Sequence, residues 1–80
     1  MTIEEWLDDA TKKLANSGSN SARLDALVLL EYTLVTPRVT LLSHPDTDLP
    51  ATTLVKLGRV LNQRLDGIPI AYIQNKKEFY

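Results

Sequence analysis

Apolar residues recur at intervals of three and four positions along the first half of the chain. Thr2 and Glu5 have the spacing of a capping box, and the helical pattern after them continues until Gly18, so we predict a helix over residues 3–17. Apolar side chains then cover most of a second helical stretch over residues 22–35, which predicts a helix in the middle of a bundle. The apolar positions are Ile3, Trp6, Leu7, Ala10 and Leu14 in the first stretch, and Leu24, Leu27, Val28, Leu30, Leu34 and Val35 in the second.

Prolines mark the starts of the helices that we predict in the second half. Thr36 is expected to be an N-cap and Pro37 a first-turn residue, which predicts a short helix over residues 37–43. Pro50 is expected to start a longer helix in the same way, and this helix continues to Gly67. The apolar positions are Val39, Leu41 and Leu42 in the short helix, and Leu54, Leu57, Leu61 and Leu65 in the long one.

Gly58 lies inside the fourth helical stretch, on its apolar side. A glycine there costs about 1 kcal/mol relative to alanine, so we expect a neighbouring helix to approach it closely. Pro69 can start one last turn, and the helical period is lost from Lys76 onward. The predicted fold class is all-α, a small bundle of four to five helices with a short extended C-terminal tail.

Composition restricts the class of protein. The chain has 80 residues, of which 44% are hydrophobic, and this suits one small domain with a single core. Nine Lys and Arg against ten Asp and Glu give a net charge of −1, which disfavours direct nucleic-acid binding. The absence of cysteine excludes disulfides, thiolate metal sites and cysteine nucleophiles. The longest apolar run, over residues 26–30, is too short to span a membrane and the acidic N-terminus is unlike a signal peptide, so we expect a cytoplasmic monomer.

Few residues offer catalytic or metal-binding chemistry. The sequence has one histidine, no glycine-rich phosphate loop and no Gly-x-Ser-x-Gly motif. His44, Asp46 and Asp48 have the alternating spacing of a calcium loop, but the glycine and the terminal glutamate of such a loop are missing. We therefore predict no catalytic, cofactor-binding or metal-ligating residue, and we interpret these three side chains as part of a solvated loop.

Four acidic residues, Glu4, Glu5, Asp8 and Asp9, gather on one face of the first predicted helix. They are candidate partner-binding residues, because an acidic surface can dock a basic partner. The alternative is a solvated face that suits the positive end of the helix dipole.

Two charged residues, Asp25 and Arg64, fall among apolar neighbours in helical projection. An unpaired buried charge is costly, so each of them needs a partner. We predict that Arg64 is partly buried and forms a structural ion pair with Asp25, with Glu31 as the second choice of carboxylate.

From Arg64 onward the sequence resembles a family signature. The residues concerned are Arg64, Gly67, Pro69, Tyr72 and Ile73, followed by Glu78 and Phe79. They are similar to the segment that closes the N-terminal domain of the HemK family, the peptide-chain release-factor glutamine methyltransferases. Asn75 departs from this pattern, because the family normally has a glycine soon after the Tyr-Ile pair.

A second motif agrees with this resemblance. Arg23, Asp25 and Ala26, followed by Leu29 and Leu30, are similar to the family's Arg-x-Asp-Ala element and leucine pair. A proline at position 50 replaces the usual Ser or Thr cap. Together the two motifs extend the resemblance over nearly the whole chain.

The resemblance implies a two-part protein, of which this chain is a fragment. Residues 1–74 would form a helical substrate-recognition domain, and residues 75–80 would begin a linker to a methyltransferase domain that lies outside this sequence. In the family, that second domain binds S-adenosylmethionine and carries an Asn-Pro-Pro-Tyr motif, which holds the glutamine of the release factor's Gly-Gly-Gln loop for protein methylation, a modification that serves translation termination. This stretch carries neither motif, so it would not be catalytic alone. Its expected partners are the release factor and its own C-terminal domain.

Two other functions are compatible with a small helical domain. The first is a free-standing helical module for protein–protein interaction, which docks a partner helix or dimerises through apolar surface. The second is a helix-turn-helix DNA binder, which is disfavoured because the second helix is too apolar to offer a recognition face.

Overall fold

The computed structural model describes residues 1–69 and 72, and within them it consists of four helices. This confirms the predicted all-α fold. The predicted extended tail, the boundary at residue 74 and most of the last turn after Pro69 lie outside the described residues. The helices are α1 (Ile3–Asn16), α2 (Ala22–Leu34), α3 (Arg38–Ser43) and α4 (Ala51–Leu65).

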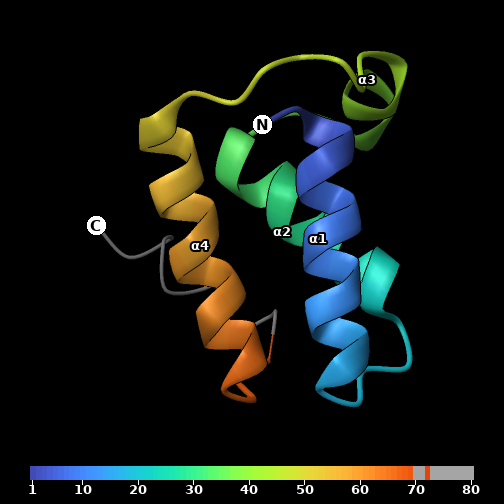
Figure 1. Cartoon of the computed structure of the whole chain (residues 1–80), viewed down its shortest axis with the longest axis vertical. Coiled ribbons are helices and arrows are strands. Elements are labelled where there is room, and N and C mark those ends of the chain that lie inside the picture. The colour runs from blue at the N-terminus through green and yellow to red at the C-terminus, as the bar shows by residue number, and fades with distance from the viewer. Residues whose placement is uncertain (70–71, 73–80) are drawn as a thin grey trace.

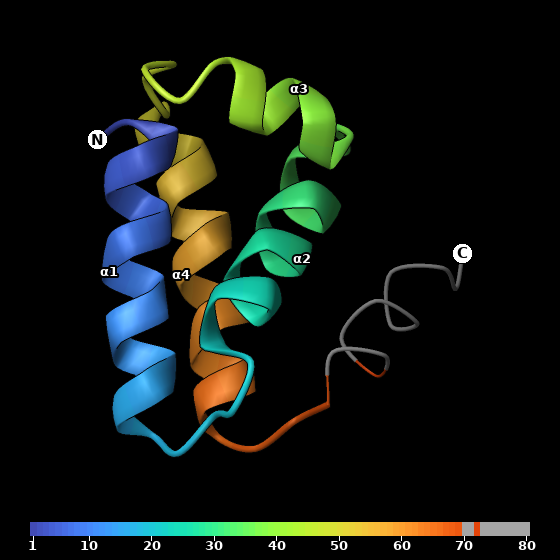
Figure 2. The same ribbon diagram turned by 90° about the vertical axis from the view of Figure 1, so that its right-hand side faces the viewer.

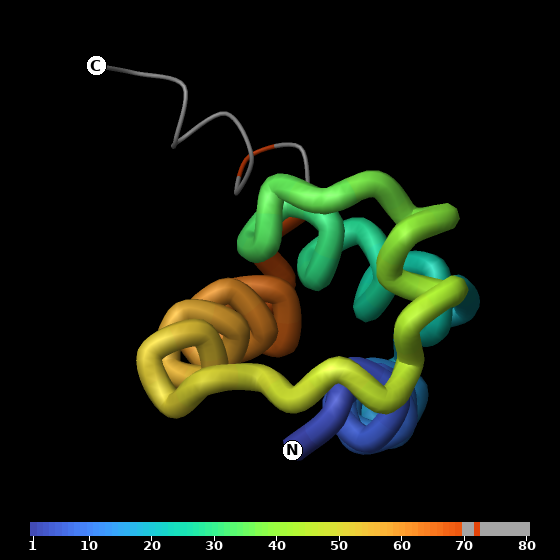
Figure 3. The backbone as a smooth tube through the Cα atoms, turned by 90° about the horizontal axis from the view of Figure 1, so that it is seen from above, coloured from blue at the N-terminus to red at the C-terminus, as the bar shows by residue number. Residues whose placement is uncertain are grey.

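Three long helices form the bundle, and the short α3 lies across one end (Figure 1). α2 runs in the opposite direction to α1 and α4, and Figure 2 shows α3 above the end of α2. Since α2 contacts all three other helices, the prediction that it lies in the middle of the bundle is confirmed. The loop between α3 and α4 crosses over the start of α1, as the view from above shows (Figure 3).

The start of α1 has the predicted capping box. Glu5 N donates to Thr2 Oγ1 at 3.2 Å, and Thr2 N donates to Glu5 Oε1 at 2.8 Å, so two otherwise unpaired backbone donors are satisfied. All five apolar positions predicted for this helix are buried, including Trp6. The helix therefore begins where the sequence indicated and packs its apolar stripe into the core.

The residues that precede α3 and α4 differ from the prediction. Pro37 and Pro50 are N-caps with extended backbone, at ψ 149° and 156°, rather than first-turn residues. Thr36 is not a cap for α3, since its hydroxyl donates to Leu34 O at 3.0 Å. The steric clash between a proline ring and the preceding residue disfavours the helical conformation at Thr36, so α2 has already ended there.

Fourteen apolar residues form one buried core. Two of the apolar positions expected to face this core from α3, Val39 and Leu42, are instead exposed. The physical reason is the shortness of α3, which rests on α2 and buries only Leu41. Leu24 of α2 is exposed as well, so the apolar circumference of α2 is only partly covered.

The expected close approach of a helix to Gly58 is wrong. Among the described residues, and apart from the backbone of α4 itself, no atom lies within 4 Å of a Cβ atom placed on Gly58. The interior glycine therefore has no packing role in the structure.

The N-terminus is tied to the loop that connects α3 and α4. Ile3 N donates to Thr47 O at 3.0 Å, and Leu49 N donates to Met1 O at 2.8 Å. The Met1 amino group also lies 3.2 Å from Asp48 Oδ1. These contacts hold the loop against the start of α1. None of the helices in the described part of the chain is long and apolar enough to cross a membrane.

Candidate functional site

The four acidic residues of α1 are not equally available to a partner. Asp8 Oδ1 lies 4.0 Å from Arg23 Nη1, and Asp9 Oδ2 lies 3.1 Å from Lys13 Nζ. Glu5 is engaged in the capping box. Within the described residues Glu4 has no ion-pair partner, so it is the carboxylate of this face that is free.

The ion pairs of this face are solvent-exposed, since every side chain in them is about half exposed or more. Exposed ion pairs contribute little to stability, because water solvates the separated charges well. A basic partner could therefore compete with Arg23 and Lys13 for these carboxylates. The face remains an acidic surface, with part of its charge screened by its own cations.

Asp25 is the only charged side chain that is buried in the part of the chain that the structure describes. Arg64 Nε lies 3.5 Å from Asp25 Oδ2, and the side chains are 28% and 11% exposed, respectively. This contact joins the start of α2 to the end of α4. Arg64 Nε forms no hydrogen bond, so the interaction is a close ion pair without a directional bond.

Two serines hold the Asp25 carboxylate in addition to Arg64. Ser19 Oγ donates to Oδ2 at 3.0 Å, and Ser21 Oγ donates to Oδ1 at 3.4 Å. The two serines were not predicted as partners of Asp25. Ser21 nevertheless lies four residues before Asp25, a spacing at which the two side chains can meet. The alternative carboxylate, Glu31, pairs with Arg38 at 2.8 Å instead.

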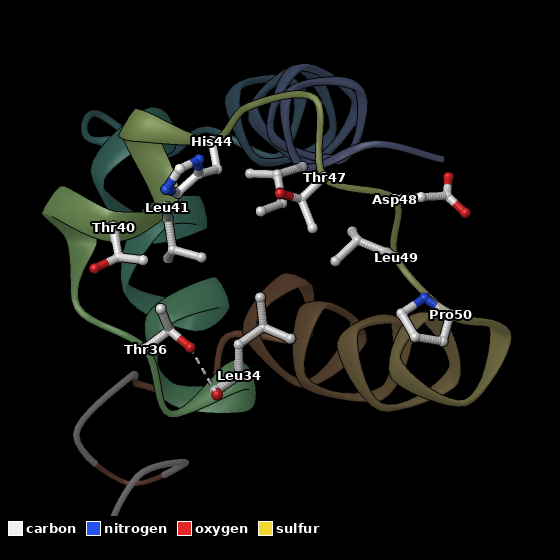
Figure 4. A pocket seen from close by; sticks show the side chains of 10 residues that line it. Leu34, Thr36, Thr40, Leu41, His44, Thr47, Asp48, Leu49 and Pro50 are labelled. Carbon is white, nitrogen blue, oxygen red and sulfur yellow. Dashed lines mark hydrogen bonds between the residues drawn. The ribbon is translucent and has the colours of Figure 1, made fainter.

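A pocket of about 260 Å³ opens at the end of the bundle where α3 lies. Leu34, Leu41 and Leu49 point toward its centre from α2, α3 and the following loop (Figure 4). Hydroxyl-bearing residues stand around its mouth, among them Thr36 and Thr40. No local pattern indicated this pocket, because its walls come from segments that are far apart in the sequence.

Three carboxylates lie at the same end of the bundle as this pocket, but only Asp48 lines it. Asp48 is part of its lining but points outward in Figure 4, and Asp46 is exposed on the same loop. Glu4 belongs to the same end of the bundle, since its backbone N donates to Pro45 O at 3.1 Å. His44 is exposed, and the described residues contain no group of three side chains arranged to hold a metal ion.

Comparison with known proteins identifies the family. The model of the PrmC N-terminal domain matches residues 5–74. A release factor glutamine methyltransferase from Vibrio cholerae is 46% identical over 80 residues, and one from Haemophilus influenzae is 38% identical over 81 residues; each alignment covers all of this chain and 28% of the relative. A bifunctional methyltransferase from Rickettsia bellii is 35% identical over 79 residues, which are 99% of this chain and 14% of that protein.

No solved structure matches the chain. The chain spans 28% of the length of the two release factor glutamine methyltransferases named above. The resemblance read from the two sequence motifs is confirmed, because the family match extends over both the Asp25 region and Arg64. The chain therefore belongs to the PrmC N-terminal domain family.

Proposed function

We propose that this chain is the N-terminal recognition domain of a cytoplasmic release factor glutamine methyltransferase. It helps to bind the peptide-chain release factor, while a C-terminal domain transfers the methyl group from S-adenosylmethionine to the glutamine of the Gly-Gly-Gln loop. The observation that carries this proposal is the family match over residues 5–74, together with relatives of that name aligned along the whole chain.

The chemistry of the chain supports a binding role over a catalytic one. Its single histidine is exposed, and the one carboxylate that is buried among the described residues is occupied by two serines and an arginine. A recognition domain binds parts of the substrate that lie away from the reacting groups. The binding energy helps to hold the substrate in the orientation that the reaction needs.

We assign the contact with the release factor to the acidic face formed by Glu4, Glu5, Asp8 and Asp9. These side chains lie near the start of α1, and most of them are exposed. Charges at the rim of an interface mainly govern the rate of encounter and its salt dependence. The face would therefore attract basic residues of the release factor.

The test neutralises the face in the full-length enzyme with Glu4→Gln, Glu5→Gln, Asp8→Asn and Asp9→Asn. Glutamine at position 5 preserves the capping box, so α1 keeps its N-terminal cap. We expect KM for intact release factor to rise several-fold, whereas kcat/KM for a short Gly-Gly-Gln peptide falls much less. Asp66→Asn, an exposed acid at the far end of α4, is the control.

Two results would contradict this assignment. Equal losses on release factor and peptide would place the effect on folding or on the catalytic domain. An unchanged KM for release factor would show that the acidic face is a solvated surface without a role in binding.

A further inference from the structure

The pocket at the α3 end of the bundle has the size and lining of a site for a side chain. Its volume of about 260 Å³ lies below the range of roughly 300 to 1,000 Å³ that is usual for small-molecule sites. Ile3, Leu34, Leu41 and Leu49 make its interior apolar, and threonines stand at its mouth. Interface residues that dominate binding energy fill apolar pockets of this kind, surrounded by groups that exclude water.

The backbone beside this pocket is strained. Val35 stands between the lining residues Leu34 and Thr36 and has a φ of 51°, which is costly for a β-branched side chain. Its side chain is also 78% exposed. This left-handed residue ends α2 and places an exposed valine beside the pocket.

The charges around the pocket indicate the kind of occupant. Glu4, Asp46 and Asp48 are exposed at this end of the bundle. Two cations stand nearby, and both are engaged: the Met1 amino group with Asp48, and Arg38 with Glu31. Since the Met1 amino group neutralises Asp48, the unpaired charge at this end, among the described residues, is that of Glu4 and Asp46. It is negative and complements a positively charged segment.

The pocket lies at the end of the bundle opposite to the end of α4. α4 begins beside the pocket and ends at the opposite end of the bundle (Figure 1), a distance of roughly 22 Å for its 15 residues. The polypeptide that follows α4 thus starts far from the pocket. A partner that approaches the α3 end would meet the pocket, its acidic rim and the exposed side chains of Val39 and Leu42 together.

We propose that this pocket receives one apolar side chain of a basic segment of the release factor. The inference rests on the proposed function and adds the site and the chemistry of the contact. The apolar anchor supplies affinity, and the flanking basic residues meet Glu4 and Asp46.

The test replaces Thr40 with Trp in the full-length protein. Thr40 lines the pocket and is itself exposed, so a large side chain there can occupy the pocket without disturbing the core. We expect Kd for intact release factor, measured by calorimetry, to rise at least about tenfold. Ala15→Trp, on an exposed position at the other end of α1, is the matched control and should leave Kd unchanged.

A second variant tests the charge of the rim independently of packing. Asp46→Asn should weaken binding several-fold at low salt and much less at high salt, because ionic strength screens exposed charges. Asp66→Asn is the control for this change, since it removes an exposed acid at the far end of α4. An identical loss in both variants would show a non-specific effect of net charge and would contradict the assignment.

The remaining outcomes separate the candidate occupants. If Thr40→Trp binds the release factor as the unmodified protein does, the pocket is not the site, although the proposed function stands. A lower thermal stability of Thr40→Trp would mean that the tryptophan disturbs the fold, and the comparison of Asp46→Asn with Asp66→Asn then decides. If Thr40→Trp lowers peptide methylation at unchanged thermal stability, the occupant is the enzyme's own catalytic domain; if it abolishes self-association in sedimentation, the occupant is a second copy. Either result overturns the inference. If the unmodified full-length protein does not bind release factor, the proposed function itself is contradicted.

Discussion

Asp25 has an environment unlike that of every other acidic residue in the described chain. It is buried, it accepts hydrogen bonds from Ser19 and Ser21, and it lies 3.5 Å from Arg64. A buried carboxylate needs this many partners because water no longer solvates it. The cluster therefore joins three segments, which are the α1–α2 loop, the start of α2 and the end of α4.

The first prediction concerns the strength of this pair. Asp25→Ala and Arg64→Ala should each lower the free energy of unfolding by about 1 to 3 kcal/mol, with a coupling of about 1 kcal/mol, because Asp25 is buried but Arg64 is partly exposed. Urea unfolding of the two single variants and the double variant measures the coupling. The exposed pair Asp9 and Lys13 is the control, with an expected coupling below about 0.5 kcal/mol. Strictly additive losses for Asp25 and Arg64 would mean that the contact contributes nothing.

The second prediction concerns Val35, which ends α2 in a left-handed conformation. Thr36 N donates to Glu31 O at 3.2 Å there, a bond that usually accompanies glycine at the helix end. Val35→Gly should raise the free energy of unfolding by about 0.5 to 1 kcal/mol, because it removes the strain and loses little packing. Val39→Gly is the control, since Val39 is similarly exposed but lies inside α3, where glycine should destabilise. A lower thermal midpoint for Val35→Gly would refute the strain argument.

At the scale of the elements, all four helices could be predicted from spacing, and the starts of α3 and α4 required correction. Capping and apolar period depend on residues within four positions of each other, so they are visible in the sequence. The roles of Thr36, Pro37 and Pro50 were misassigned, because proline is compatible with both the N-cap and the first turn. The choice between these positions depends on the direction from which the chain enters the helix.

The third prediction is that Gly58→Ala stabilises the domain. Gly58 lies inside α4 without a neighbour for its added methyl group, so the gain should be the helix propensity difference of about 1 kcal/mol. Thermal or urea unfolding measures it. Gly67→Ala is the control and should destabilise, because Gly67 has a φ of 92°. A loss of stability in Gly58→Ala would reveal a packing constraint at this position.

At the scale of the whole molecule, the two ends of the bundle differ in character. One end holds the apolar pocket and its acidic rim, and the other holds the Asp25 cluster. The Asp25 cluster joins α2 to α4, whereas the pocket end is the part that we propose contacts a partner. This division agrees with the proposed recognition role, in which one end of the bundle contacts the partner.

The fourth prediction is that the isolated chain of 80 residues does not bind S-adenosylmethionine. Its three glycines are widely separated, so it lacks the glycine-rich turn between strand and helix that holds such a cofactor. Calorimetry with micromolar cofactor should give no saturable heat, and the full-length enzyme is the positive control. A saturable signal from the isolated chain would place part of the cofactor site in this domain.

The sequence by itself determined the positions of the four helices, the apolar stripe of α1 and the family of the chain, because each depends on local spacing or on a linear motif. Only the tertiary structure decided which surfaces remain open. Gly58 faces empty space, Leu42 is exposed, and Ser19 reaches Asp25, although none of these is evident from near neighbours in the chain. The pocket belongs to this second group, since its walls meet only when α2, α3 and the loop before α4 are packed together.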